Sequence, residues 1–540
     1  MSNLLEQASL VLIPSGYKED VVYSEIPLDG SGDMVFSRSS NGTRVNSAGL
    51  VEVCPWNLVQ QSETFDNASW AKNTGGTSTV TVTANSGIAP NGTTTADRIQ
   101  LTRDSLGFAQ VIQTVTTTTS QSYTFSVYLK SLSGTPTVMF GSFGGTNTQT
   151  ATLTNEWVRY TWTATSPSTS AFALLMIWGG VGSTSLSADF LAWGYQLVEG
   201  SSAKPYFPTT DRLNVPRLTY QNGGGGCPSL LLEKQSTNLV SYSQDFSNAY
   251  WSKLGQGVGS TSVVTANYAI SPDGTQNATR FVCNLNGGTT SSDRSWMIAS
   301  FTAQATSTVS IWIKLNSAGT KTVLLSDSGG GTKTISGTDW QRIDATFVGA
   351  SGEFRIGLIG GTTSDTLDCC IWGAQAEAGS YPTSYIPTTS ASATRVIDEI
   401  TPKSLSSVGI TANYTLYFQL GQCNMSAAES WILQASSGAN TPFQIYGTTA
   451  ILYTSTGYLY PFSFLSTNPN NNKVAVSYDG TNIKVFWNGA KMGQWTATSE
   501  WANLTTLDLA YGISTQIQYK EVVLFNVGLS DADGISLTTI

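Results

Sequence analysis

Hydrophobic and polar residues alternate along most of the chain, which is the pattern of half-buried β-strands. The segments 123–131 (YTFSVYLKS) and 307–315 (STVSIWIKL) alternate in this way, and so do the segments 155–165 and 338–348. Clusters of Gly, Pro, Asn and Asp separate such segments at short intervals, as tight turns require. Long helix-forming runs of Ala, Glu, Lys and Leu are nearly absent, so the pattern predicts an all-β protein.

Several phrases occur twice in the chain. NLVQQSETFDNASWAK at 57–72 returns as NLVSYSQDFSNAYWSK at 238–253, and each copy continues into a Pro-Asn-Gly or Pro-Asp-Gly turn at 90–92 or 272–274. Repeats of this length indicate repeated structural modules. Many short strands with frequent turns are typical of β-sandwiches, and we expect each copy to be a jelly roll.

The last part of the chain has a different strand pattern. KVAVSYDGTNIKVFWNGAKMGQWTAT at 473–498 predicts strands joined by hairpin turns at Asp479-Gly480 and Asn488-Gly489. A connector containing Arg and an aliphatic residue precedes each module and also this last domain. The predicted divisions are an N-terminal segment, jelly-roll module 1, a linker, jelly-roll module 2 and a second type of sandwich, at 1–55, 56–212, 213–236, 237–392 and 393–540.

Composition excludes several classes of function. The net charge is −9 and charged residues make up 11% of the chain, which argues against a nucleic-acid partner. No apolar run has the ~18–20 residues that a membrane-spanning helix needs, and the N-terminus lacks the basic region of a signal peptide. Six Cys without CxxC spacing predict neither a disulfide framework nor a zinc site.

The chain has no His, which excludes Ser-His-Asp and Cys-His catalysis and His-ligated metals. Two carboxylates could still cleave a glycosidic bond. However, the E-x-D-x-E string of concanavalin-like hydrolases is missing, and the adjacent Asp398 and Glu399 fall in a connector. We therefore expect no enzymatic activity and no cofactor, apart from a structural calcium ion.

The repeated phrase N-L-hydrophobic-x-x-S-x-x-F-x-N-x-x-W-x-K resembles jelly rolls of the carbohydrate-binding-module type in bacteriophage virion proteins. VSYDGTNIKVFWNG and YKEVVLFNVGLSDADG resemble the concanavalin A-like or laminin-G-like sandwich. The N-terminal segment resembles the leading part of fibre proteins of Bacteroidetes-infecting phages, such as the crAss-like phages.

The resemblance implies a fibre on the virion surface, assembled in the host cytoplasm. It also implies docking on other virion proteins through residues 1–55, a homo-oligomer such as a trimer, and binding of host-surface or mucosal glycans. A purely structural head or tail component without a ligand is the alternative.

Aromatic residues are the candidate sugar-binding groups, because an aromatic ring can stack on the C–H face of a pyranose. Residues that both modules share are better explained as structural, and these are Trp70, Trp251, Trp157, Trp340, Trp193 and Trp372. The glycan-binding candidates are therefore aromatics that the copies do not share, or that lie in the last domain. They are Trp178, Trp296, Tyr453, Tyr458, Tyr460, Trp495 and Trp501.

A few Asp residues are weak candidates for ligands of a structural calcium ion. Asp531 and Asp533 could supply part of a calcium site, but Ser530 or Asp531 would equally cap a short terminal helix, and we favour the cap. Asp66, Asp97 and Asp189 are weaker calcium candidates in module 1, where backbone carbonyls would have to complete the site.

Overall fold

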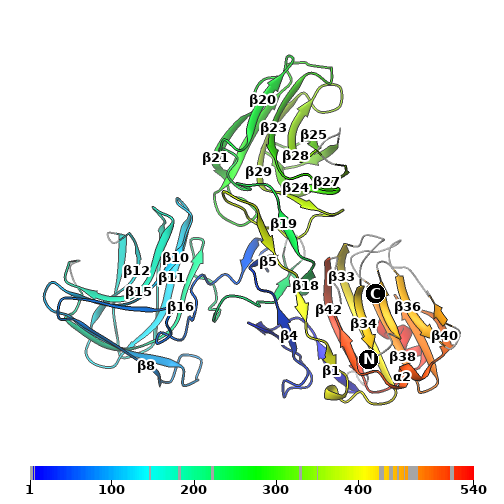
Figure 1. Cartoon of the computed structure of the whole chain (residues 1–540), viewed down its shortest axis with the longest axis horizontal. Coiled ribbons are helices and arrows are strands. Elements are labelled where there is room, and N and C mark those ends of the chain that lie inside the picture. Colours follow the sequence, from blue (N-terminus) through cyan, green and yellow to red (C-terminus); the bar gives the residue numbers. More distant parts are fainter. Residues whose placement is uncertain are drawn as a thin grey trace. The chain divides into compact units, whose positions relative to one another are not determined.

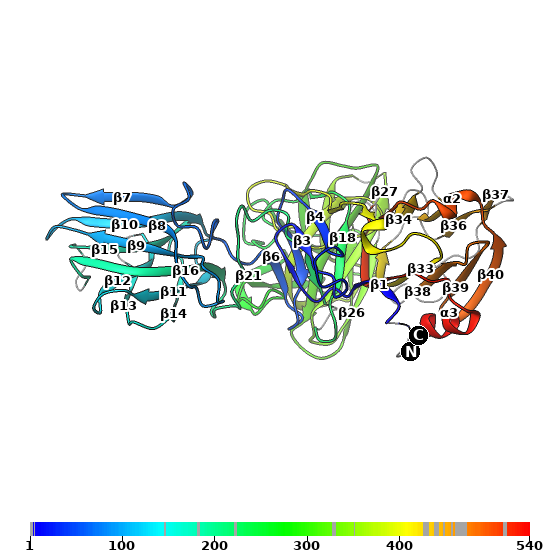
Figure 2. The same cartoon turned by 90° about the horizontal axis from the view of Figure 1, so that it is seen from below.

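The computed structural model is built almost entirely of β-strands, which confirms the all-β prediction (Figures 1 and 2). Its contacts divide the chain into two compact units, one of Pro55–Leu213 and one of Met1–Cys54 together with Asn214–Ile540. Among the described residues, no helix is long and apolar enough to cross a membrane. The described residues are 4, 6–144, 147–180, 184–220, 224–326, 331–349, 351–424, 431–436, 442–446, 449–454, 457–459, 472–510 and 516–540.

Module 1 is a jelly-roll sandwich of two five-stranded sheets, in the orders β13-β12-β15-β10-β7 and β14-β11-β16-β9-β8. The chain passes repeatedly from one sheet to the other, so residues distant in sequence pair in space. Side chains that alternate inward fill the core, for example Val111 and Leu175, both fully buried. The strands are β7 (Ala71–Gly75), β8 (Thr79–Gly87), β9 (Ala96–Thr102), β10 (Phe108–Thr116), β11 (Ser122–Ser131), β12 (Thr137–Phe143), β13 (Asn147–Thr152), β14 (Val158–Thr165), β15 (Ser170–Trp178) and β16 (Ser187–Glu199).

Module 2 repeats this topology strand for strand, with sheets β20-β23-β28-β25-β26 and β21-β22-β29-β24-β27. The two Pro-x-Gly turns take the predicted form, because Gly92 and Gly274 have φ of 86° and 84°. The strands are β20 (Ser252–Gln256), β21 (Val263–Ala269), β22 (Ala278–Asn284), β23 (Arg294–Ser300), β24 (Thr306–Leu315), β25 (Thr320–Ser326), β26 (Thr332–Ser336), β27 (Gln341–Val348), β28 (Glu353–Ile359) and β29 (Thr366–Ala378).

The C-terminal domain is a second sandwich, with one sheet in the order β32-β41-β34-β35-β36-β37. Ser530 caps the last helix, accepting a hydrogen bond from the Asp533 N–H at 3.2 Å, as predicted. The elements are β32 (Lys403–Ser404), η1 (Ser406–Val408), β33 (Tyr414–Asn424), β34 (Trp431–Ser436), β35 (Phe443–Tyr446), β36 (Thr449–Thr454), β37 (Gly457–Leu459), β38 (Asn472–Tyr478), β39 (Asn482–Trp487), β40 (Ala490–Thr496), α2 (Ser499–Ala502), β41 (Thr506–Asp508), β42 (Gln516–Phe525) and α3 (Asp531–Thr538).

The N-terminal segment and the predicted linker contribute strands to this C-terminal sandwich. The second sheet of the sandwich has the order β17-β18-β42-β33-β38-β39-β40. In it, β18 pairs with β42, and β1 also pairs with β42. Leu10 and Leu12 on β1 are fully buried in the same core. The segment 1–54 is thus not a separate appendage. Its strands and those of the connectors are β1 (Ala8–Leu12), β2 (Tyr17–Lys18), β3 (Val21–Val22), β4 (Met34–Ser37), β5 (Gly42–Val45), β6 (Val51–Cys54), β17 (Arg217–Thr219), β18 (Ser229–Glu233), β19 (Ser236–Asn238), β30 (Ala393–Arg395) and β31 (Glu399–Ile400).

A buried ionic network, which we call the connector hub, joins the connectors. Arg217 pairs with Glu233 at 2.6 Å and also with Asp398. Asp398 in turn pairs with Arg38 at 2.8 Å, and Arg395 lies 3.1 Å from Glu233. All five side chains are 0–1% exposed. Charges that are this deeply buried are stable only while each keeps its partners, so the hub ties its four segments together.

Candidate functional site

The aromatic residues that the two modules share lie in the interior or at closing contacts. Trp70 and Trp251 are fully buried, and their indole N–H groups donate to the carbonyls of Gln61 and Tyr242 at 2.8 and 3.0 Å. Each ring also packs on the Phe of its own repeated phrase, with centroids 4.9 and 5.0 Å apart. No ring face is left for a ligand, so these two Trp residues stabilise the modules.

The other shared Trp residues also make closing contacts. The indole N–H groups of Trp157 and Trp340 donate to the carbonyls of Ile88 and Ile270, each at 3.1 Å. Trp193 is 5% exposed and donates to Thr95 Oγ1 at 3.1 Å. Trp372 is 1% exposed and packs on Tyr385. Trp157 and Trp340 therefore make equivalent contacts in the two modules, whereas Trp193 has a bonded indole N–H and the Trp372 Nε1 has no partner among the described residues.

Module 1 has a second apolar cluster on the opposite side of one sheet from its core. In β10 and β15, Ala109 and Ile177 point into the core, whereas Phe108 and its cross-strand partner Trp178 point outward. The cluster, which we call the module 1 outer face, consists of Phe108, Ile112, Met139, Phe172, Leu174, Met176 and Trp178. Because successive residues of a strand point to opposite faces, strands that are apolar at every position create this second surface.

The two aromatic rings at one end of this face lie directly against glycines. A Cβ atom added to Gly75 would lie 2.5 Å from the Phe108 ring, and one added to Gly180 would lie 2.7 Å from the Trp178 ring. Phe108, Phe172 and Trp178 are half-buried, so each ring keeps an exposed part. Asn73 and Gln110 share the next cross-strand position, which places amide groups beside the rings.

The loop beside Trp178 is fixed by Asp104. The backbone N–H groups of Thr77 and Gly107 donate to its carboxylate at 2.8 and 2.6 Å, and these bonds hold the pKa of Asp104 below its ordinary value. Leu106, at the tip of this loop, is 83% exposed, and Gly179 next to Trp178 donates to the Gly107 carbonyl. The rim of the outer face is therefore a fixed turn that presents an apolar side chain.

The equivalent face of module 2 is different in chemistry. Trp296 on β23 is only 4% exposed, and the guanidinium groups of Arg294 and Arg355 lie 4.5 and 5.7 Å from the centre of its ring. Gly357 is the cross-strand partner of Trp296 and makes room for it. The Trp296 ring is therefore not an open platform, although the sequence prediction placed it among the sugar-stacking candidates.

The C-terminal candidates are only partly accessible. Trp501 is fully buried and donates to the Tyr453 carbonyl at 2.7 Å, so its ring cannot stack on a sugar. Trp495 packs against the core. Tyr458 is 58% exposed and its ring centre lies 5.0 Å from that of Tyr453, so this pair offers some aromatic surface. Tyr460 lies outside the described residues.

Two of the three calcium candidates of module 1, Asp97 and Asp189, have partners on their carboxylates, whereas the bond at Asp66 is made by its backbone carbonyl. Asp97 accepts hydrogen bonds from the backbone N–H groups of Phe65 and Asn85, and Asp189 pairs with Arg98 at 2.6 Å. The Asp66 carbonyl accepts a bond from Lys72 Nζ. Within the described part of the chain, no group of three or more His, Cys, Asp or Glu side chains could hold a metal.

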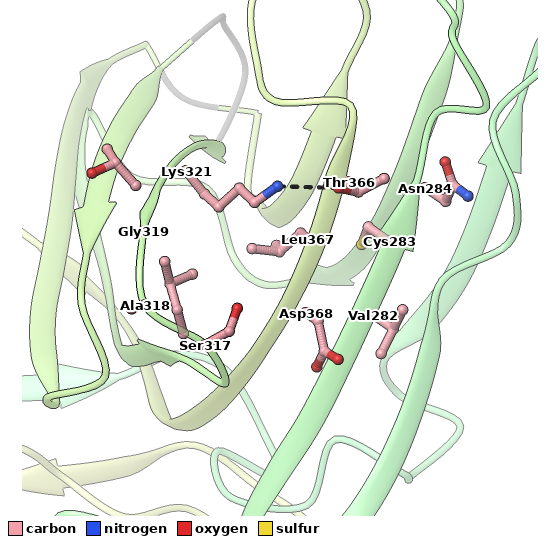
Figure 3. Close-up of a pocket in the computed structure, with 12 residues that line it drawn as sticks. Val282, Cys283, Asn284, Ser317, Ala318, Gly319, Lys321, Thr366, Leu367 and Asp368 are labelled. Atoms are coloured by element: carbon pink, nitrogen blue, oxygen red, sulfur yellow. Dashed lines mark hydrogen bonds between the residues drawn. The ribbon is translucent and has the colours of Figure 1, made fainter.

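Module 2 also contains a pocket of about 320 Å³, which lies apart from its outer face (Figure 3). Lys321 points across it and donates to Thr366 Oγ1 at 3.1 Å. Asp368 at its edge pairs with Arg280, and burial raises the pKa of the Cys283 thiol to about 12, so this thiol stays protonated. These groups are occupied with one another, and the pocket offers little binding chemistry.

Comparisons with known proteins found weak similarities. No family model and no curated protein matches the chain. The tandem CBM22-1–CBM22-2 domain of Xyn10C from Paenibacillus barcinonensis is 13% identical, covering 60% of this chain and 98% of that one, with a TM-score of 0.20. The family 11 carbohydrate-binding module of Lic26A-Cel5E from Clostridium thermocellum is 13% identical, covering 25% and 91%, with a TM-score of 0.19.

Domain 4 of the arabinanase AbnA from Geobacillus stearothermophilus is 12% identical, covering 30% of this chain and 84% of that one, with a TM-score of 0.21. At scores this low, the function of this chain has to be inferred from its own geometry.

Most of the module 1 outer face was missed by the sequence prediction. Only Trp178 was a candidate, whereas Phe108, Phe172, Leu174 and Met176 were not. A signal was present, because residues 171–178 (AFALLMIW) are apolar at every position. A strand of a two-sheet sandwich needs apolar residues on one face only, so such a run indicates a second covered or ligand-binding surface.

Proposed function

We propose that the protein binds glycans through the module 1 outer face. The observation that carries this proposal is the placement of Phe108 and Trp178 as cross-strand partners on one sheet, outside the core. A pyranose presents an apolar C–H face that packs on such rings, while the neighbouring amides of Asn73 and Gln110 can bond its hydroxyl groups.

Binding without cleavage is the second part of the proposal. Hydrolysis of a glycosidic bond generally uses two carboxylates about 5–10 Å apart. The described cross-strand positions of the outer face, from Gly75 and Phe108 to Thr116 and Ser170, carry no Asp or Glu. This composition supports a recognition surface and offers no acid and base for hydrolysis.

We further propose that the protein belongs to a phage virion, as a head or tail fibre that is assembled in the host cytoplasm and displayed on the particle. The support for this placement is the resemblance of its repeated phrases to those of phage fibre proteins. Docking on other virion proteins through the N-terminal segment and a homotrimeric state rest on the same resemblance. Because β1 is part of the C-terminal sandwich, docking would use the exposed loop around Leu28, which is 93% exposed.

A glycan array with the full-length protein tests the binding proposal. Wild type is expected to bind one or more glycans. Phe108→Ala combined with Trp178→Ala is expected to lower affinity on the order of 1,000-fold, because each of the two rings contributes roughly 2 kcal/mol of apolar contact. Ile88→Ala, a 65% exposed apolar residue elsewhere in module 1, is the matched control and should bind as wild type. Equal binding by wild type and the double variant would overturn the proposal.

A Leu28→Asp variant tests the docking surface separately. It leaves β1 and its buried side chains in place, whereas removal of residues 1–55 would take a strand from the C-terminal sheet. Incorporation into particles is expected to fall while the far-ultraviolet spectrum and glycan binding stay unchanged. Full incorporation of Leu28→Asp would contradict docking through this loop.

A further inference from the structure

The outer face of module 2 gathers two cationic groups around one indole. Arg294 and Arg355 come from adjacent strands, β23 and β28, and both guanidinium groups lie within 6 Å of the centre of the Trp296 ring. Arginine over a tryptophan face is a favourable cation–π contact, which holds both side chains in place. Two fixed guanidinium groups on one face form a pre-organised arrangement for an anion in a chain whose net charge is −9.

Two buried hydrogen-bond donors on the outer face of module 2 have no acceptor among the described residues. The Trp296 Nε1–H is buried and has no hydrogen-bond partner among the described residues, and the same is true of Arg355 Nε. The indoles of Trp70, Trp251, Trp157 and Trp340 each donate to a backbone carbonyl, whereas Trp372 Nε1 in the interior of module 2 also has no partner in the described part of the chain. A buried donor without an acceptor costs about 1–3 kcal/mol, so an oxygen atom supplied by a ligand would recover that cost.

The two guanidinium groups of the site differ in their ion-pair partners. Glu353 pairs with Arg355, and its cross-strand partner is Ser300. Arg294 donates from Nε to the Ser291 carbonyl at 2.9 Å and from Nη1 to Gln256 Oε1 at 3.4 Å, and both acceptors are uncharged. Within the described part of the chain, no carboxylate is paired with Arg294. Arg294 therefore has no ion-pair partner among the described residues, although the carboxylate of Asp293 is on the preceding residue.

We propose that the outer face of module 2 binds anionic glycans, with Arg294 and Arg355 contacting a carboxylate or sulfate group and the Trp296 N–H contacting a sugar oxygen. The apolar neighbour Leu254, which is 37% exposed and is the cross-strand partner of Trp296, gives the sugar ring a surface to rest on. This inference extends the proposed function to a second site, and its residues are independent of those on module 1.

Binding of the full-length protein to three probes tests the inference. The probes are oligogalacturonate for carboxylates, heparin oligosaccharide for sulfates, and a neutral xylo-oligosaccharide, each titrated by calorimetry at low and high salt. At least one anionic probe is expected to bind, more weakly at high salt, and Arg294→Gln combined with Arg355→Gln should lower its affinity about tenfold to 100-fold. Which anionic probe is retained distinguishes carboxylate from sulfate recognition.

The controls separate this site from a general charge effect and from module 1. Arg280→Gln removes one positive charge from the other sheet of module 2 and should leave binding of the anionic probe unchanged. Trp296→Phe keeps an aromatic ring but removes the N–H, and should lower affinity about threefold to tenfold. The Phe108→Ala/Trp178→Ala variant should retain binding of the anionic probe.

Absence of binding by both anionic probes, or equal loss in Arg280→Gln and in the double arginine variant, would overturn the inference. Either result would leave the proposal for module 1 standing if the neutral probe still binds and depends on Trp178. The opposite outcome is also possible to recognise. If binding of the neutral probe does not depend on Trp178, while an anionic probe still binds and needs the two arginines, the module 1 proposal is wrong and this one stands.

Discussion

The two jelly rolls have the same strand order and the same closing tryptophans, but opposite chemistry on one outer face. The strand pair β10–β15 of module 1 can be aligned with the pair β23–β28 of module 2. In this alignment, Phe108 and Leu174 of module 1 occupy the positions of Arg294 and Arg355 in module 2. The inward side of each sheet stays apolar because the fold requires it, whereas nothing in the fold requires either outer face. This difference supports the proposal that the two outer faces bind different ligands.

The largest expected effect concerns what the modules share. Trp70→Ala and Trp251→Ala should each destabilise its own module by about 4 kcal/mol, since both rings are fully buried and leave large cavities. Calorimetric unfolding of the full-length protein should show one shifted transition in each variant. If unfolding of the Trp70 variant were unchanged, the prediction that Trp70 and Trp251 stabilise their modules in the same way would be wrong.

The connector hub gives the unit containing module 2 an acid sensitivity of its own. Burial alone would raise the pKa of Glu233, but Arg395, Arg217 and the hydrogen bonds from Ser384 outweigh it and bring the pKa to about 2, below the ordinary 4.5. Because the pKa is lower in the folded state, this stabilisation is complete above about pH 4.5 and is lost as the pH falls toward 2.

Glu233→Gln should therefore lower the free energy of unfolding at pH 7 by about 3 kcal/mol, because it leaves Arg217 and Arg395 short of a buried partner. The variant should also lose part of the pH dependence between 4.5 and 2 in the unfolding transition of this unit. Thermal unfolding followed over that pH range measures both effects. Identical pH profiles for wild type and variant would contradict this account of the hub.

A substitution can also convert one outer face toward the other. Phe108→Arg places in module 1 the residue type that module 2 has at the corresponding position. We expect affinity for a neutral glycan to fall by about 2 kcal/mol, or roughly 30-fold, because the half-buried ring is lost from the face. Titration calorimetry checks this, with Ile359→Ala on module 2 as the matched control. A retained affinity would show that the ring is not a contact.

The smallest expected effect concerns two equivalent surface ion pairs. Arg98–Asp189 and Arg280–Asp368 both have a separation of 2.6 Å and are partly exposed. Asp189→Ala and Asp368→Ala should each change the free energy of unfolding by less than about 1 kcal/mol, since exposed pairs are screened by water. A loss of several kcal/mol in Asp189→Ala that appears only when calcium is present would instead support a metal site there.

The sequence allowed prediction of the fold because its signals are local and periodic. Alternation in 123–131 and the Asp479-Gly480 and Asn488-Gly489 turns all correspond to strands and turns of the structure. The integration of residues 1–54 into the C-terminal sheet was not predictable, because the pairing of β1 with β42 joins segments more than 500 residues apart. Sequence periodicity carries no information on which distant strands pair.

The candidate site was predicted only through Trp178. Burial decides whether an aromatic ring can stack on a sugar, and burial depends on tertiary neighbours. Trp501 is buried and bonded to the Tyr453 carbonyl, and the guanidinium groups of Arg294 and Arg355 lie close to the Trp296 ring. Phe108 and Phe172 gave no signal as single residues. They become a surface only when β10 and β15 pair in register.

The most direct test of the central claim is a crystal structure of the full-length protein with the neutral oligosaccharide that binds best on the array. We predict a sugar ring stacked on Trp178 or Phe108, with its hydroxyl groups bonded to Asn73 or Gln110. A sugar bound only at the Tyr453–Tyr458 pair, or anywhere other than the module 1 outer face, would contradict the account.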